Sequence, residues 1–502
     1  MMYVLERRAV ILTALLHFVL FAIGQDKQDY TWLFNNRASG FNGLYVNTTF
    51  KFSEGSYFSF LDTVQFNSGR TNSSITDETG KLLFYTNGCQ VIQADHSLME
   101  NGDSLNFGNF YTEWWDNCSG GYVGFQDIII LNDPKNINGY YIIHKTFNFI
   151  TTPLTFYLEG LKYTYVDMTL NDGKGKVTVK NKTFFNKRDL VSSFLTAIRH
   201  QNTKDWWLIQ MKENSNAYLK FILDENGPML VDSQNIGPKT TRNTSAGGFA
   251  KFSPDGKQWA WFTTENGLNL FDFDGETGEL SNQKLLMIPH RRVFTGLEFS
   301  PNSRFIYISA HDSLFQIDTW HFELTYELID TFDKGEQGFA NFHGISLAPD
   351  CKIYMTSSNS TKSLSRINYP NKKGKACDFR QHEVPLFATN GIGIPNFPRL
   401  RVDEIDVCDS TEQYTDVIDI EEKRALMRIY PNPVKDIAKI QSEESGNLYL
   451  FDMRGVMVKS LFIQKGSNYL DMQAMDNGFY FINFINNQGG HYGTKIFKTN
   501  SE

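Results

Sequence analysis

Apolar and polar residues alternate in short runs along most of this chain, and the runs end at Gly, Asn, Asp or Pro. An alternation with a period of two is typical of β-strands that bury one face. From Arg428 onward the pattern is RIYPNPVKDIAKIQ, NLYLFDMRGVMVKSLFI, DMQAMDNGFYFINFINN and GTKIFKTN. These strands and tight turns predict a small Ig-like β-sandwich over residues 426–502.

The middle of the chain repeats a unit of strand, turn and strand. The clearest copies contain FSPDGK, FSPNSR and LAPDCK, and they begin near Gly248, Leu297 and Ile345, about 48 residues apart. Proline sets φ at one corner of the turn and Asp or Asn tolerates the next corner, so each unit predicts a hairpin. Weaker copies begin at Ser74, Ile128 and Leu195.

A period of this length with about four short strands per unit is typical of propeller blades. One blade cannot cover both faces of its own sheet, whereas a ring of blades covers all of them, with large aromatic side chains between neighbours. Six units plus a closing blade from Trp32–Phe34 and the strand after IGIPNFPRL (Ile392–Leu400) predict seven blades over residues 25–402. The fold class is therefore all-β; a β-helix or a pair of sandwiches is the alternative for the middle region.

The two regions outside these domains differ in composition. Arg7 and Arg8 precede an uncharged run, Ala9–Ile23, that is shorter than the about 20 apolar residues of a membrane span. We therefore expect a signal peptide over residues 1–24, with a buried N-terminal helix as the alternative. Residues 403–425 are acidic and poor in large apolar side chains, which predicts a linker, unless a last propeller strand lies there. No later run is long enough for a transmembrane span.

The C-terminal segment resembles the type A C-terminal sorting domain of the type IX secretion system of Bacteroidota. The matching pieces are PNPV at Pro431–Val434, LFDMRGVMV at Leu450–Val458, NGFYFI at Asn477–Ile482 and the last strand at Lys495–Lys498. The resemblance implies export to the cell surface or the medium, the type IX machinery as partner, and removal of the domain at export. The residues that carry it are Pro431, Asn432, Pro433, Gly455, Gly478, Tyr480 and Lys495.

The middle region also resembles a family, the surface propellers common in Bacteroidota. The resemblance lies in WLFNNRASGFN from Trp32, GKLLFYTNGCQVIQADHSLMENGD from Gly80, YTYVDMTLNDGKGKVT from Tyr163 and LTAIRHQNTKDWWLI from Leu195, and it continues through GIPNFPRL. It implies only a fold and a location, because that family has no settled activity.

Charge and cysteine content narrow the possibilities. The net charge of −8 and the isoelectric point near 5.8 provide no basic surface for nucleic acid. Export places the five cysteines in an oxidising compartment, where disulfides persist. We expect pairs Cys351–Cys377 and Cys89–Cys118 with Cys408 free, or else five reduced and buried cysteines. Metal binding by cysteine is not expected, because no CxxC spacing occurs.

Three kinds of site could carry chemistry. His200, His311 and His343 follow strands and could meet at the propeller axis around a metal or as a general base, or each could bond its own turn. The sequence DFDGETGE offers Asp272, Asp274 and Glu276 to Ca²⁺, although Asp-Gly and Thr-Gly more simply make a turn. The third set could stack on sugar rings or pack between blades, and it comprises Trp114, Trp115, Tyr111, Tyr122 and Phe125.

Two functions follow from these features. The first is a non-catalytic surface binding or adhesion module for an unknown glycan or protein ligand. The second is an exported propeller-type hydrolase or lyase with an axial site. We favour the first, because neither GxSxG nor another catalytic motif is present. Convergence of the three histidines with carboxylates around the axis would favour the second.

Overall fold

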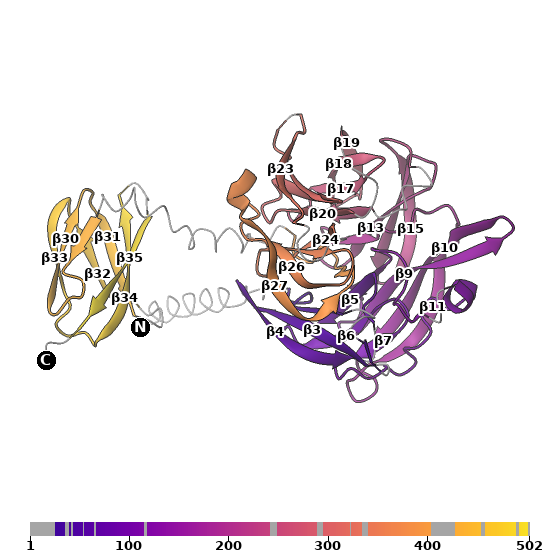
Figure 1. Ribbon diagram of the computed structural model, residues 1–502, viewed down its shortest axis with the longest axis horizontal. Helices are drawn as coiled ribbons and strands as arrows, with labels where there is room; N and C mark the ends of the chain where they lie inside the picture. The colour runs from indigo at the N-terminus through magenta and orange to yellow at the C-terminus, as the bar shows by residue number, and fades with distance from the viewer. Residues whose placement is uncertain are drawn as a thin grey trace, which may run out of the picture. The chain divides into compact units, whose positions relative to one another are not determined.

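The computed structural model describes residues 26–35, 40–41, 44–53, 55–64, 67–114, 118–240, 248–288, 295–321, 323–333, 340–402, 427–452, 457–487 and 491–499. The chain divides into two compact units, residues 1–409 and 410–502, and the division falls within the expected linker (Figure 1). The expected signal peptide (1–24), the linker (403–425) and Gly455 lie outside the described residues.

Seven four-stranded sheets form the N-terminal unit in the described part of the chain. The first joins β1 (Thr31–Phe34), β2 (Gly40–Phe41), β3 (Leu44–Ser53) and β4 (Ser56–Val64); the second joins β5 (Thr71–Thr76), β6 (Leu82–Thr86), β7 (Val91–Gln93) and β28 (Ile394–Pro395). The other five are antiparallel meanders of four consecutive strands each. The third sheet comprises β8 (Ile128–Asn132), β9 (Gly139–Thr151), β10 (Leu154–Asp167) and β11 (Lys176–Phe185), and the fourth comprises β12 (Thr196–Arg199), β13 (Trp206–Met211), β14 (Ala217–Asp224) and β15 (Gly227–Asn235).

The fifth sheet comprises β16 (Phe249–Phe252), β17 (Gln258–Thr263), β18 (Gly267–Phe273) and β19 (Leu280–Leu286); the sixth comprises β20 (Thr295–Phe299), β21 (Phe305–Ala310), β22 (Ser313–Asp318) and β23 (Tyr326–Thr331); and the seventh comprises β24 (Phe342–Leu347), β25 (Ile353–Ser357), β26 (Thr361–Ile367) and β27 (Phe379–Asn390).

The sheets are blades around a common centre. The first strand of one sheet contacts that of the next at β5 and β8, at β12 and β16, and from β16 through β20 to β24. Strand β1 contacts both β5 and β27, which closes the ring. Figure 1 shows the sheets set around this centre. The prediction of a seven-bladed propeller is confirmed.

The way in which the ring closes differs from the expectation. Strand β28 runs parallel to β5, with Ile394 opposite Thr71, so the C-terminal part of the propeller completes the blade of β5, β6 and β7. Strand β1 instead pairs with β3, with Trp32 opposite Phe50. The expectation that Trp32–Phe34 and the C-terminal end of the propeller form one blade together is therefore wrong. Strand β3 follows β1 closely in the sequence, and pairing with it closes a much shorter loop.

The repeated Ser-Pro-Asp/Asn turns form the predicted hairpins. Ser253 Oγ donates to Asp255 Oδ1 at 2.6 Å and accepts the Gln258 N–H at 2.9 Å, between β16 and β17. Ser300 Oγ makes the same two bonds, to Asn302 Oδ1 at 2.7 Å and from the Phe305 N–H at 2.8 Å. The serine hydroxyl thus satisfies backbone groups that the turn leaves unpaired.

Aromatic side chains fill the wedges between neighbouring blades. Trp259 and Trp261 of β17 are fully buried against Trp207 and Tyr218 of the preceding blade. Trp261 also donates its indole N–H to the Tyr218 hydroxyl at 3.2 Å. This packing is why an aromatic-rich sequence favours a ring of blades over separate sheets.

The C-terminal unit is a β-sandwich. One sheet has the order β29 (Met427–Tyr430), β30 (Ile437–Ser442), β33 (Gly466–Asp471), and the other has the order β32 (Met457–Ile463), β31 (Gly446–Phe451), β34 (Gly478–Asn486), β35 (His491–Lys498). Alternate residues of both sheets form one buried core. The described part of the propeller unit contains a π-helix at Phe110–Trp114 and a 3₁₀-helix at Gly374–Cys377. Within the described residues, no helix is long and apolar enough to cross a membrane.

The Pro-Asn-Pro motif holds one edge of this sandwich. Asn432 Nδ2 donates to the Lys495 carbonyl at 3.1 Å, and Asn432 Oδ1 accepts the Phe497 N–H at 2.9 Å. Prolines such as Pro431 and Pro433 have no N–H to leave unpaired, so they are tolerated at such an edge. The motif therefore ties the first strand of the domain to its last.

The other residues of the sorting resemblance lie close by in sequence or space. Tyr480 is buried in the core and donates its hydroxyl to the Asp476 carbonyl at 2.9 Å. Gly478 begins β34, and Lys495 Nζ lies 5.8 Å from the centre of the Phe479 ring. Lys495 is exposed, as are Pro431, Asn432 and Pro433, so a partner can reach these residues, whereas Tyr480 is buried.

Candidate functional site

The segment 392–401, which contains the motif GIPNFPRL, crosses the centre of the propeller. Asn396 donates its backbone N–H to the Asn72 carbonyl at 2.9 Å, beside the pairing of β28 with β5. Its side-chain amide donates to the Ile128 carbonyl of β8 at 2.9 Å and to the Leu195 carbonyl, just before β12, at 3.0 Å. One asparagine thus joins three blades.

The rest of the segment reaches the other four blades. Phe397 stacks on Trp32 of β1 with ring centres 5.8 Å apart. Arg399 donates to the Phe252 carbonyl of β16 at 2.8 Å and to Glu298 of β20 at 2.9 Å. A Cβ on Gly344 of β24 would lie 2.8 Å from the side chain of Ile394, so this close approach requires glycine. A segment that touches the first strand of every blade must lie where those strands converge, on the axis.

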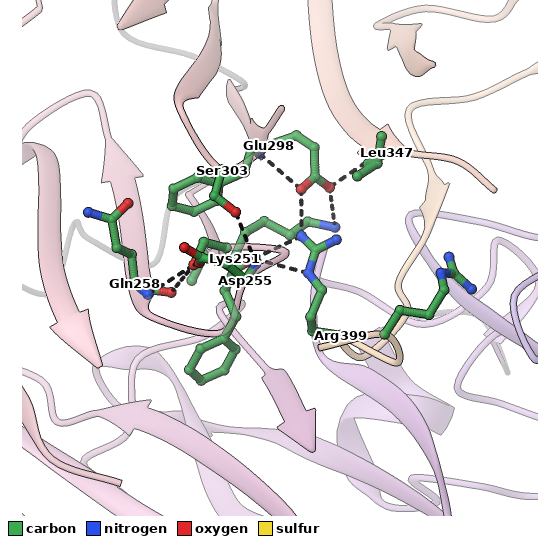
Figure 2. A network of polar contacts seen from close by, with 12 residues as sticks. Lys251, Asp255, Gln258, Glu298, Ser303, Leu347 and Arg399 are labelled. Atoms are coloured by element: carbon green, nitrogen blue, oxygen red, sulfur yellow. Dashed lines mark hydrogen bonds and ion pairs between the residues drawn. The ribbon is translucent and has the colours of Figure 1, made fainter. Parts of the chain in front are cut away.

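Glu298 is the centre of an ionic network on this axis (Figure 2). Its carboxylate, 1% exposed, accepts hydrogen bonds from Lys251 Nζ at 3.1 Å, Arg399 Nη2 at 2.9 Å and the Leu347 N–H at 3.1 Å. Burial alone would raise the pKa of Glu298, but the two cations and the hydrogen bonds hold it below its usual value. The network joins β16, β20 and β24 to the axial segment.

The three histidines singled out in the sequence do not meet. His343 is fully buried, with its ring 4.8 Å from that of Phe125, and burial lowers its pKa to about 3. His200 stacks on Trp207 at 5.3 Å. His311 lies in the turn after β21, with Nδ1 3.8 Å from Asp312 Oδ1. In the described part of the chain, no group of three or more His, Cys, Asp or Glu side chains is placed to hold a metal ion.

A fourth histidine, which sequence reasoning missed, anchors the loop that contains Asn106, between β7 and β8. His144 of β9 is fully buried, and its Nδ1 lies 2.7 Å from Asn106 Oδ1. The Asn106 amide nitrogen donates to the Gly88 carbonyl at 3.0 Å, so the oxygen faces the ring and His144 Nδ1 carries the proton. His144 Nε2 then accepts the Thr164 hydroxyl at 3.1 Å. Burial lowers the pKa of His144 to about 3, which keeps the ring neutral. The available signal was a His-Lys pair inside the apolar strand YYIIHKTF.

The loop held by His144 supports a two-stranded arm. Strand β8 pairs with β9 only as far as His144, and β11 pairs with β10 only from Leu161 onward. Strands β9 and β10 continue to pair beyond those points, from Phe147 opposite Leu158 to the tip. We call residues 147–158 the aromatic arm; it extends away from its blade (Figure 1). A lone hairpin of this kind is marginally stable unless something packs against it.

The π-helix packs against the aromatic arm. The Phe110 ring lies 5.6 Å from that of Phe147 and 5.9 Å from that of Phe156. Tyr122 accepts the Phe147 N–H at 2.7 Å. Four apolar residues of the arm and its supporting loop nevertheless remain between 37% and 58% exposed: Phe107, Ile150, Leu154 and Phe156. Leu154 and Phe156 share one face of the arm, and Ile150, which pairs with Thr155, lies on the other face. Exposed apolar side chains on a protruding hairpin are candidates for an interaction surface.

This surface differs from the expected sugar-stacking platform. Tyr122 and Phe125 are buried, the first beneath the arm and the second against His343. Tyr111 is half-buried and lies 5.6 Å from Phe107. Trp115 and the side chain of Trp114 lie outside the described residues. The packing alternative therefore holds for Tyr122 and Phe125, and the exposed rings are those of Phe107 and Phe156.

The cysteines pair in part as expected. Cys89 and Cys118 form a disulfide with Cα atoms 6.2 Å apart, which closes the loop that supports the arm. Cys377 is a free thiol, buried in the core beside β24, and burial raises its pKa to about 11. Cys351 is disulfide-bonded. The expected Cys351–Cys377 bond is therefore wrong: Cys377 ends the 3₁₀-helix inside the core. Cys408 lies outside the described residues.

Removing the disulfide is expected to destabilise the propeller. The bond closes a loop with a sequence separation of 29, for which chain entropy gives about 3–4 kcal/mol. The double variant Cys89→Ser/Cys118→Ser should lower the free energy of urea unfolding by that amount. Dithiothreitol also reduces the disulfide of Cys351, so it should destabilise both proteins, but the wild-type chain by about 3–4 kcal/mol more than the variant. An equal loss on reduction in the two proteins would contradict the assignment.

The DFDGETGE sequence forms the turn between β18 and β19. Asp274 Oδ1 accepts the backbone N–H groups of Glu276 at 2.8 Å and Thr277 at 3.1 Å, and these bonds lower its pKa. Asp272 Oδ2 accepts the Asn282 amide at 2.7 Å. The carboxylates of Asp272 and Asp274 thus serve the turn; calcium binding there remains a prediction.

Comparison with known proteins identifies the C-terminal unit. Residues 428–499 match the family described as the secretion system C-terminal sorting domain. The unit is a type IX sorting domain of the Bacteroidota kind, and the protein is exported to the cell surface or the extracellular space.

The chain is also remotely similar to several known proteins. A candidate 6-phosphogluconolactonase of Bacteroides uniformis is 12% identical, with 89% of this chain and 100% of that chain covered and a TM-score of 0.37. The β-propeller domain of Cps50 (Swd1) from Myceliophteria thermophila is 11% identical, with 66% and 93% covered and a TM-score of 0.36. A protein of Acanthamoeba polyphaga mimivirus named for ankyrin repeats is 23% identical over 178 residues, which are 36% of this chain and 24% of that protein. The chain thus spans about a quarter of this curated relative.

Proposed function

We propose that this exported protein is a non-catalytic binding module that contacts a glycan or protein ligand through the aromatic arm. The observation that carries the proposal is the group of exposed apolar side chains on the arm and its loop, Phe107, Ile150, Leu154 and Phe156. A rigid support under such a surface reduces the entropy lost when a ligand binds. The Cys89–Cys118 disulfide supplies that support. Rings of this kind can stack on the apolar faces of sugars or pack against an apolar protein surface.

The centre of the propeller supports this choice over an axial enzyme. An exported hydrolase or lyase of the propeller type would place its site where the blades converge. In this chain, that position is taken by residues 392–401, whose Asn396 and Arg399 are bonded to surrounding strands. Glu298, the buried carboxylate at the axis, is held charged in a network that ties blades together.

A binding screen with the full chain tests the proposal. Glycan arrays and immobilised surface proteins would first identify ligands of the wild-type chain. The double variant Phe107→Ala/Phe156→Ala should lower affinity for those ligands at least about tenfold, because it removes the two exposed rings. Phe387→Ala, which removes an equally exposed ring on β27, should leave affinity unchanged.

Two outcomes would contradict the proposal. Ligands that bind the double variant as well as the wild-type chain would show that the arm is not the site. Turnover of a ligand that survives in the double variant would replace binding by the hydrolase or lyase alternative.

A further inference from the structure

Strand β4 is the outer edge of the first blade, and it differs from the outer strands of the other blades. Its register with β3 is unbroken from Tyr45 opposite Val64 to Ser53 opposite Ser56. The outer strands β11, β15, β19, β23 and β27 each pair with their neighbour through at least one register shift. Strand β7, the outer strand of the second blade, has three residues and is bridged by Leu98.

These irregularities protect the other edges. A bulge twists an edge strand and interrupts its row of free N–H and C=O groups, so that a further strand cannot add to it. Left-handed residues interrupt three of these strands in the same way, Asn181 in β11, Asn282 in β19 and His382 in β27. Strand β4, SYFSFLDTV, contains no bulge, proline, lysine or arginine. Among the described residues, no strand pairs with its outer edge, and Figure 1 shows it at the margin of the propeller.

The residues of β4 suit one particular partner. Phe58 is 65% exposed and Leu61 is 57% exposed. The sequence around them is nearly palindromic: Phe58 and Phe60 flank Ser59, and Tyr57 and Leu61 lie one position further out. A palindromic strand matches an antiparallel copy of itself, because a twofold axis through its centre places equivalent residues opposite one another.

We propose that β4 pairs antiparallel with β4 of a second copy of this chain, about a twofold axis at Ser59. Phe58 then lies opposite Phe60 of the second copy on one face of the joined sheet, and Tyr57 lies opposite Leu61 on the other. Symmetry produces each pair twice. The joined strands extend both blades into one continuous sheet and remove the open edge of each.

Charges beside the edge do not oppose this pairing. Asp62, the acidic residue of β4, forms an ion pair with His96 of its own chain at 2.9 Å. Lys51 of β3 lies over the Phe60 ring, with Nζ 5.6 Å from the ring centre. Both charged side chains therefore have partners within their own copy. The interface between the two copies is formed by aromatic, aliphatic and serine side chains.

Sedimentation equilibrium across micromolar concentrations tests the dimer. The full chain should show a reversible monomer–dimer equilibrium. Phe58→Lys places a charge at the interface between the two copies and should weaken dimerisation at least about tenfold. Leu285→Lys, at a residue 50% exposed on the bulged strand β19, should leave dimerisation unchanged. Equal weakening by both variants would overturn the proposal.

Cross-linking tests the register. In Ser59→Cys the two introduced thiols face each other, with Cα atoms about 4.5–5.5 Å apart, and should form an intermolecular disulfide under mild oxidation. In Thr63→Cys the two thiols are separated along the strands and should not cross-link. A chain that stays monomeric at every concentration, with no cross-link from Ser59→Cys, would overturn the proposal and leave the edge to an extended peptide of another protein.

Discussion

Replacing Glu298 with alanine is expected to lower the free energy of unfolding of the propeller by about 3–5 kcal/mol. The substitution leaves the buried Lys251 and the mostly covered Arg399 at the axis without their shared carboxylate. Two uncompensated charges repel each other where water cannot screen them, and the Leu347 N–H loses its acceptor. A loss of this size is a large fraction of the stability of an ordinary domain.

Tryptophan fluorescence during urea unfolding measures this effect cleanly. All eight tryptophans precede residue 321, so the signal reports the propeller and not the sorting domain. Glu383→Ala is the matched control: it removes a carboxylate that pairs with Arg366 at 3.0 Å on the partly exposed strand β27. Such surface pairs contribute at most about 1 kcal/mol. Equal losses in the two variants would contradict the special role of the axial network.

Mild acid is expected to destabilise the propeller by about 3 kcal/mol between pH 6.5 and pH 5. His144 and His343 have folded-state pKa values of about 3, against 6.5 for an ordinary histidine. Above pH 6.5 both rings are neutral in either state, and their contribution to stability is fully present. As the pH falls through 6.5 the unfolded chain binds protons that the folded protein does not bind. The loss per histidine therefore steepens toward about 1.4 kcal/mol per pH unit, which is reached near pH 5. The loss continues until the pH approaches 3.

Unfolding midpoints at several pH values test this prediction through its slope. His144→Gln removes one of the two buried rings and should halve the slope between pH 6.5 and pH 5, whatever its effect on stability at neutral pH. His200→Gln, in the surface turn after β12, should keep the full slope. A slope that His144→Gln leaves unchanged would show that His144 is not the source of the acid sensitivity.

Local signals explain which parts of the fold could be predicted. The Ser-Pro-Asp turn at Ser253 sets its hairpin through bonds within five residues, so its sequence is sufficient to recognise it. Alternation likewise marks which face of each strand is buried. The sorting motif at Asn432 was visible as a family pattern, although its bonds to the last strand are not local.

Contacts between distant residues explain what could not be predicted. Asn396 and Ile128 are 268 positions apart, and Arg399 and Glu298 are 101 apart, so no period or spacing connects them. The position of Cys377 inside the core, rather than beside Cys351, is also a tertiary property. The aromatic arm was missed because its strands alternate like any blade strand, and only pairing shows where the rest of the blade ends.

Hydrogen exchange at Asn396 and Arg399 tests the central claim that the chain's own segment occupies the propeller axis. The Asn396 amide donates to the Asn72 carbonyl, and the Arg399 amide donates to the Ala197 carbonyl at 2.7 Å. If the segment lies on the axis, both amides should exchange only when the whole propeller unfolds, as slowly as the amides of β5 and β12. Rapid exchange at these two amides, while β5 and β12 remain protected, would contradict the account.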